Sequence, residues 1–248
     1  MNSICRFGLL VTGEGEESFL PLLFRTLMAR AYCQFEVIRR IGQRSPRTSQ
    51  RPNALKMVGT SRRVPTRDEE DIGIPALGFL RNHPNSFVLL VDDLERDRLA
   101  ISRAVFDRYP AALDGTLAAS GLQNRAAVHF LVNMLEAYYF ADSSAVNKVA
   151  GRQVLAADHP ADVEQIGHPK NDLKRRWMAF DAKMHGDPIL RLLDIPHILA
   201  RPDECCWLRT IFAWCIGKLG AVDALYDETT GQEFCLDSGC QSAVTRGQ

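Results

Sequence analysis

The chain has 248 residues, of which 46% are hydrophobic and 24% are charged, as in an ordinary globular protein. Lys plus Arg and Asp plus Glu each number 30, so net charge alone does not indicate an acidic or a basic partner. No run approaches the about 18 apolar residues of a membrane-spanning helix. The first apolar stretch is too short for a signal peptide. We therefore expect a cytoplasmic protein with no membrane partner.

The first third of the chain predicts two strands and a helix, followed by a long loop. Residues 6–12 form an apolar run typical of a buried strand, and residues 16–30 carry the wide apolar stripe of a helix. A second strand is expected at 35–41. Residues 42–72 are rich in Arg, Ser, Thr and Pro, which predicts a loop.

The middle of the chain repeats the alternation. A helix is expected at 73–81, and the continuous apolar run at 86–91 is typical of a central parallel strand. A further helix to about residue 112, a strand at 126–132 and a helical segment at 133–142 follow. This order predicts an α/β protein with a parallel sheet flanked by helices.

The rest of the chain predicts helices and a tail. We expect an α/β domain over 1–150 that contains the basic loop 42–72. A mainly helical extension over 151–228 would pack on it, and 229–248 would form a flexible tail.

Two acidic clusters follow predicted strands. Glu14 and Glu16 come after the first strand, and Asp92 and Asp93 come after the run at 86–91. Ligands of parallel α/β sheets bind at the carboxyl ends of the strands. Carboxylates gathered there repel one another and favour a hard cation, which indicates Mg²⁺ or Mn²⁺ and phosphoryl chemistry.

Each cluster also has a structural explanation. Acidic side chains stabilise the first turn of any helix, which accounts for Glu16 without a metal. Asp92 or Asp93 would serve equally as the N-cap of the next helix. Gly13 and Gly15 resemble a phosphate loop, but a third glycine is missing and Glu would repel phosphate, so a nucleotide-binding enzyme is the weakest alternative.

Glu136 lies in the apolar segment NMLEAYYFAD, where it is either buried with a partner or on an exposed stripe. The loop at 42–72 concentrates positive charge in a neutral protein, which suits a phosphate backbone or an acidic protein face and is also compatible with a merely solvated loop. Nucleic-acid contacts are predicted in this loop and in the later basic segment HPKNDLKRRW. They are Arg44, Arg47, Arg51, Lys56, Arg62 and Arg63 in the loop and Lys170 in the segment.

These motifs, in this order, resemble the Toprim fold and within it an uncharacterised bacterial family of Toprim-like proteins classed as a domain of unknown function. The resemblance covers residues 6–215. Thr12 stands where that family has a Glu, and the family's Asp-x-Asp is here Asp92-Asp93-Leu94. The matching segments are Gly13-Glu14-Gly15-Glu16, Val91-Asp92-Asp93, Leu135-Glu136-Ala137-Tyr138 through Asp142, and Pro169-Lys170 with Leu173.

The resemblance implies an Mg²⁺-dependent enzyme that cleaves or rejoins nucleic acid. Distantly similar nucleases of the overcoming-lysogenisation-defect family work beside an ATPase in phage defence. The metal ligands would come from Glu14, Glu16, Asp92 and Asp93, and the catalytic residues would be Glu16, Asp92 and Glu136. The alternative is a non-catalytic subunit that binds nucleic acid or a partner ATPase.

Overall fold

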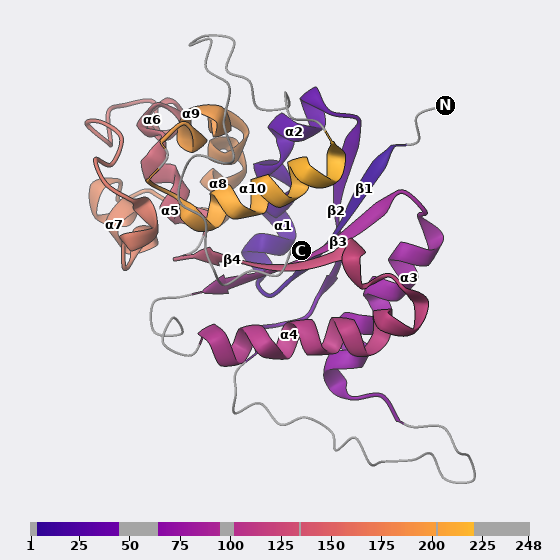
Figure 1. Ribbon diagram of the computed structural model, residues 1–248. Helices are drawn as coiled ribbons and strands as arrows, with labels where there is room; N and C mark the ends of the chain where they lie inside the picture. The colour runs from indigo at the N-terminus through magenta and orange to yellow at the C-terminus, as the bar shows by residue number, and fades with distance from the viewer. Residues whose placement is uncertain (1–3, 45–63, 95–101, 134, 202, 221–248) are drawn as a thin grey trace.

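The computed structural model describes residues 4–44, 64–94, 102–133, 135–201 and 203–220 (Figure 1). Four parallel strands form one sheet in the order β2-β1-β3-β4. The central strands are apolar on both faces, as expected for parallel strands covered by helices on each side. The strands are β1 (Cys5–Val11), β2 (Cys33–Arg40), β3 (Ser86–Leu94) and β4 (Ala126–Val132).

Helices cover both faces of the sheet (Figure 1). The chain goes from β1 to β2 through α1 (Glu14–Leu23) and α2 (Arg25–Arg30), which pack on one face. It crosses to β3 and β4 through α3 (Ile74–Asn82) and α4 (Ser102–Leu117), which pack on the other face. Strands are therefore added to one side of β1 and then to the other, and this switch point between β1 and β3 is where α/β sheets bind ligands.

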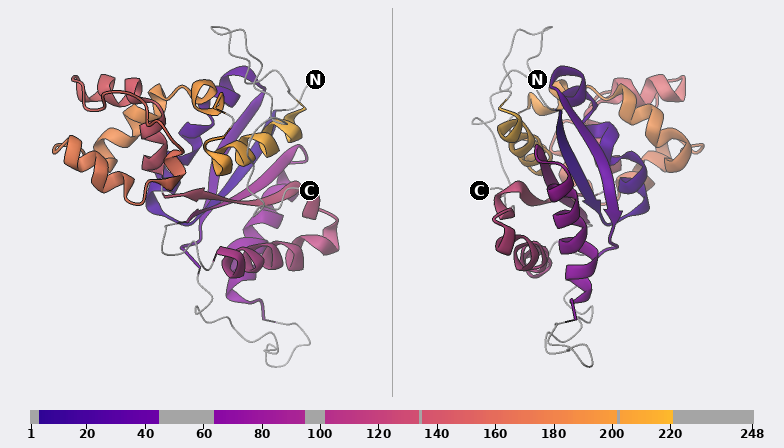
Figure 2. Two further views of the ribbon diagram at one scale, coloured as in Figure 1. Left: turned by 60° about the vertical axis from the view of Figure 1, so that its left-hand side comes forward. Right: turned by 90° about the vertical axis from the view of Figure 1, so that its right-hand side faces the viewer.

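The C-terminal part is mainly helical and joins the layer that holds α1 and α2. Figure 2 shows its helices gathered on one side of the sheet, away from α3 and α4. The last helix places Trp214 against Phe7 of β1 and Phe87 of β3, with ring centroids 6.1 and 6.0 Å apart. These helices are α5 (Leu135–Tyr138), α6 (Ser143–Ala150), α7 (Pro169–Arg176), α8 (Ala182–Leu192), α9 (Ile195–Leu199) and α10 (Cys206–Leu219).

The predicted α/β architecture is confirmed: a parallel sheet is flanked by helices and followed by a helical C-terminal part. The described residues of the predicted extension share one hydrophobic core with the strands. The predicted tail at 229–248 lies outside the described residues.

Several local predictions need correction. The helix predicted at 16–30 is two helices, because Phe24 leaves the helical conformation and its ring stacks on Phe35 at 4.1 Å. The segment predicted as helix at 133–142 contains only the short α5 and the 3₁₀ turn η5 (Tyr139–Ala141). The predicted loop 42–72 ends in a π-helical turn, η1 (Glu69–Gly73).

The N-cap explanation for the aspartates is wrong. β3 continues through Leu94 and pairs with β4 over Asp92 and Asp93, so both aspartates are strand residues and neither is a helix N-cap. Their positions on a strand, not on a helix, decide where their side chains point.

Candidate functional site

A pocket of about 480 Å³ lies at the carboxyl ends of β1 and β3, at the switch point of the sheet. The turn after β1 and the first turns of α1 form one wall, and Asp93 at the end of β3 contributes to another. The segments around α5, α7 and α8 supply the rest. Residues far apart in the sequence therefore meet at one place in the fold.

Glu16 is the buried member of the first acidic cluster. Its side chain lies over Gly13, where a Cβ atom would come within 2.0 Å of Glu16 Oε2. Glu16 is only 6% exposed. Burial raises the pKa of this carboxyl group, and the nearby charges of Glu136 and Asp92 add to the effect. The absence of a side chain at Gly13 thus gives Glu16 its position at the pocket.

Glu136 is the second buried acid, brought to the same pocket by α5. It is 7% exposed, so the exposed-stripe interpretation of this residue is wrong. Burial raises the pKa of Glu136, and the positive charge of Lys170 opposes that rise. Burial disfavours the ionised form of both carboxyl groups, and the charge of Glu136 adds to this effect at Glu16, which makes the pocket a natural place for a cation or a proton.

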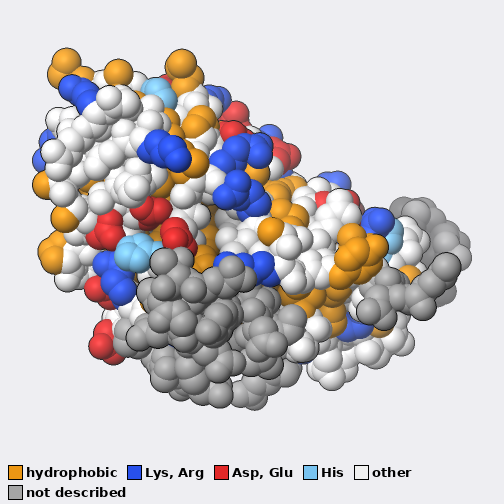
Figure 3. All heavy atoms as spheres, turned by 90° about the horizontal axis from the view of Figure 1, so that it is seen from above, with side chains coloured by type: hydrophobic (Ala, Val, Ile, Leu, Met, Phe, Trp, Pro, Cys, Tyr) orange, Lys and Arg blue, Asp and Glu red, His pale blue; other side chains and the backbone are white. Residues whose placement is uncertain are grey.

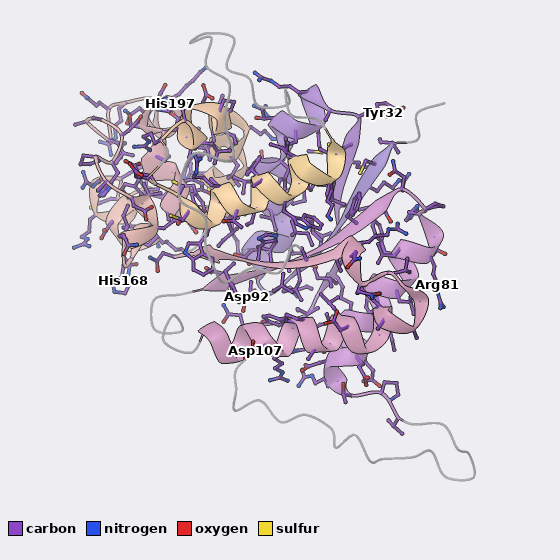
Figure 4. The ribbon with its side chains drawn as sticks, in the orientation of Figure 1. Tyr32, Arg81, Asp92, Asp107, His168 and His197 are labelled. Carbon is purple, nitrogen blue, oxygen red and sulfur yellow. The ribbon has the colours of Figure 1, made fainter. Side chains whose placement is uncertain are left out.

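Asp92 and Asp93 point to opposite faces of the sheet, as neighbours on a strand do. Asp93 lines the pocket, whereas Asp92 is fully buried between the sheet and α4 (Figure 4). Thr12 Oγ1 donates to Asp92 Oδ1 at 2.8 Å, and the Tyr109 hydroxyl donates to Asp92 Oδ2 at 2.9 Å. Asp92 thereby joins β1, β3 and α4 beneath the pocket.

Thr12 holds the two central strands together at this point. Its hydroxyl oxygen also accepts a hydrogen bond from the Asp93 backbone N–H at 3.3 Å. Thr12 therefore fixes the backbone of β3 at Asp92 and Asp93.

The remaining predicted metal ligand, Glu14, is exposed and paired with Lys183 at 3.0 Å. Within the described residues, no group of three or more His, Cys, Asp or Glu side chains is arranged to hold a metal ion. Mg²⁺ commonly keeps several waters and needs only one or two carboxylates besides substrate phosphate. Glu16, Glu136 and Asp93 are the buried carboxyl groups in the lining of this pocket.

Arg44 does not occupy the position predicted for a nucleic-acid contact. Its side chain is 2% exposed and forms ion pairs with Asp68 at 3.0 Å and Asp71 at 2.6 Å. Arg108 of α4 also pairs with Asp68. Because its guanidinium is enclosed by these carboxylates, Arg44 is a structural residue here, and a phosphate backbone does not reach it.

The other basic residues have mixed outcomes. Lys170 lines the pocket, and its positive charge acts to lower the pKa of Glu136. The predicted contacts that lie outside the described residues are Arg47, Arg51, Lys56, Arg62 and Arg63.

Glu164 does not line the pocket, but it is a supporting residue that the sequence analysis missed. The Tyr138 hydroxyl donates to Glu164 Oε1 at 2.9 Å, and Asn133 Nδ2 donates to the Glu164 carbonyl at 2.7 Å. These two bonds hold both ends of the segment that presents Glu136. The backbone N–H groups of Trp207 and Leu208 also donate to the Glu164 carboxyl group, which anchors the same segment to α10. No periodicity or motif in the sequence signals this role.

The fold and the pocket define an α/β protein with a pocket rich in carboxyl groups at its switch point. A comparison with models of known protein families, with curated proteins and with solved structures finds no match. Across the described residues, no helix is both long enough and apolar enough to cross a membrane.

Proposed function

We propose that this chain is an Mg²⁺-dependent Toprim-like nuclease, or the nuclease subunit of an assembly with an ATPase. The observation that carries the proposal is the pairing of Glu16 and Glu136, two buried carboxyl groups, in one pocket at the switch point. A divalent cation held by these carboxyl groups would offset the cost of burying their negative charges.

Each pocket residue has a task in such a reaction. Bound Mg²⁺ supplies an activated water and stabilises negative charge on a phosphodiester. Glu16 and Glu136 would hold the ion, and Asp93 would orient water at the same pocket. Asp92 does not line the pocket and would support it from beneath. The hydroxyl groups of Thr12 and Tyr109 donate to Asp92 and thereby fix the end of β3.

A non-catalytic binding subunit is the second candidate. It is favoured by Thr12 in place of the family's Glu, and by the lack of a preformed three-ligand group among the described residues. It predicts nucleic-acid binding that weakens steeply with salt and no cleavage with any metal.

The test compares two glycine variants. Gly13→Ala places a Cβ atom 2.0 Å from Glu16 Oε2, so the carboxyl group must move by more than 1 Å. Gly78→Ala in α3 is the control, because nothing lies within 4 Å of its Cβ position and it does not line the pocket. A displacement of this size at a reacting group costs on the order of 100-fold in rate.

The assay measures cleavage of circular DNA, linear DNA and RNA with Mg²⁺ or Mn²⁺, with and without a candidate ATPase. We expect wild type and Gly78→Ala to cleave, and Gly13→Ala and Glu16→Gln to lose about 100-fold or more while remaining folded. Equal cleavage by Gly13→Ala and wild type would contradict the role of Glu16. Salt-sensitive binding without cleavage by any variant would select the binding subunit.

A further inference from the structure

The pocket at the switch point holds more negative charge than its own lysines balance. Its described lining carries four carboxyl groups and two lysines. Lys183 pairs with Glu14 at 3.0 Å, which leaves three carboxyl groups against Lys170. Three negative charges against one positive charge leave two uncompensated when the groups are ionised. The three carboxyl groups belong to Glu16, Asp93 and Glu136.

This excess of negative charge is local to the pocket. The whole chain has 30 acidic and 30 basic residues. On the face of the molecule shown in Figure 3, basic side chains in blue and acidic side chains in red are interspersed. A cation is therefore attracted to the pocket and not to a generally acidic protein surface.

Glu136 is the carboxyl group that the protein supports least. It is 7% exposed and lines the pocket. Among the described residues, only its own backbone N–H donates a hydrogen bond to its carboxyl group, and no ion pair within 4.0 Å reaches it. Burying a carboxylate without a partner is costly, so a positive charge brought by a ligand would be favourable at this position.

The rest of the lining is apolar and partly aromatic. Phe19, Leu135 and Tyr139 line it, in a pocket of about 480 Å³ that has the size of a site for a small organic molecule. Leu135 and Tyr139 are buried, whereas Phe19 is partly exposed. A hydrated Mg²⁺ presents water to its surroundings and gains nothing from such a wall. A cation on a hydrocarbon chain buries its methylene groups there, and an ammonium group is also attracted to an aromatic face.

We infer that the pocket binds a small aliphatic diamine, with ammonium groups at the buried carboxyl groups and the methylene chain against Phe19 and Leu135. The two positive charges of a diamine match the two uncompensated negative charges of the lining. This ligand goes beyond the proposed nuclease reaction, because it uses the apolar wall that Mg²⁺ does not need. Where both cations bind, they compete for Glu16 and Glu136.

The experiment measures binding by isothermal titration calorimetry at pH 7.5 and fixed ionic strength. The probes are 1,4-diaminobutane, the uncharged 1,4-butanediol of the same chain length, inorganic phosphate, and Mg²⁺ alone. The test variants are Phe19→Leu, which removes the aromatic face, and Glu136→Gln, which removes the buried charge. Tyr32→Leu and Glu17→Gln are their controls. Tyr32 is 69% exposed, Glu17 pairs with Arg40 at 3.2 Å, and neither lines the pocket.

We expect wild type and both controls to bind 1,4-diaminobutane and to bind neither the diol nor phosphate. Phe19→Leu should bind the diamine about 5-fold more weakly at an unchanged melting temperature and leave Mg²⁺ affinity as it is. Glu136→Gln should weaken the diamine about 10-fold or more. A wild type that does not bind the diamine would overturn the inference. So would phosphate or the diol binding as tightly as the diamine, or a diamine affinity that is equal in wild type and Phe19→Leu.

The diamine site and the nuclease fail differently in this design. Diamine binding that depends on Phe19 and Glu136, without cleavage in Mg²⁺ or Mn²⁺, would keep the diamine site and remove the nuclease. Metal-dependent cleavage by a wild type that does not bind the diamine would keep the nuclease and remove the diamine site. If both hold, added 1,4-diaminobutane should raise the Mg²⁺ concentration that half-maximal cleavage requires in wild type, and raise it less in Phe19→Leu.

Discussion

His129 of β4 offers a test of the fold that does not depend on any activity. Its side chain is 1% exposed and faces α10, with the ring centroid 6.0 Å from that of Trp214. Neither ring nitrogen has a hydrogen-bond partner among the described residues. Burial lowers the pKa of His129 from 6.5 to about 3. The folded protein therefore holds this imidazole neutral.

The sign of the pH effect follows from the two pKa values. Below about pH 6.5 the unfolded chain binds a proton at His129, whereas the folded chain does not. The contribution of neutral His129 to the free energy of unfolding is therefore fully present above pH 6.5 and is lost as the pH falls toward 3. Linkage gives a loss of roughly 1.4 kcal/mol between pH 7.5 and pH 5.5 from this residue alone.

The perturbation is His129→Leu, which has a similar volume and no titratable group. Urea unfolding at pH 7.5, 6.5 and 5.5 gives the free energy of unfolding of each variant. We expect the advantage of His129→Leu over wild type to grow by about 1.4 kcal/mol from pH 7.5 to pH 5.5. Other titrating groups cancel in this difference.

His168 supplies the control, because His168→Leu changes an exposed histidine and leaves the buried imidazole of His129 in place. Its unfolding free energy should run parallel to that of wild type across this pH range. A constant difference between His129→Leu and wild type would refute the burial of a neutral imidazole at this position.

Two further predictions concern stability. Asp68→Asn leaves the buried cations of Arg44 and Arg108 without their shared carboxylate, and we expect a loss of about 3–5 kcal/mol in urea unfolding. An effect below about 1 kcal/mol would show that this ion-pair network is solvated in solution. Gly8→Ala places a Cβ atom 2.7 Å from the Phe79 ring and should cost about 1–3 kcal/mol. The smaller side chain of Phe79→Leu should restore much of that loss in the double variant, and purely additive effects would contradict the contact.

The sequence determined the sheet and the general place of the site. Continuous apolar runs gave the central strands, because a strand covered on both faces must be apolar along its whole length. Strand–helix alternation gave the parallel arrangement, and parallel strands bring their carboxyl ends to one edge. Glu16 and Asp93 could therefore be expected near one another from local patterns alone.

Only the tertiary structure decided which charged residues belong to the pocket. Asp92 and Asp93 differ by one position, and the pleat sends one under the sheet and the other into the pocket. Arg44 was expected on the surface, but the carboxylates of Asp68 and Asp71 enclose it.

The segment that carries Glu136 shows the same limit. Its position depends on hydrogen bonds to Glu164, a residue 26 positions beyond Tyr138. Periodicity and capping patterns describe neighbours within a few turns of chain, so they reveal which segments form helices and strands. Pairing between distant polar groups is decided by packing in three dimensions, and for that reason the composition of this pocket emerged only with the fold.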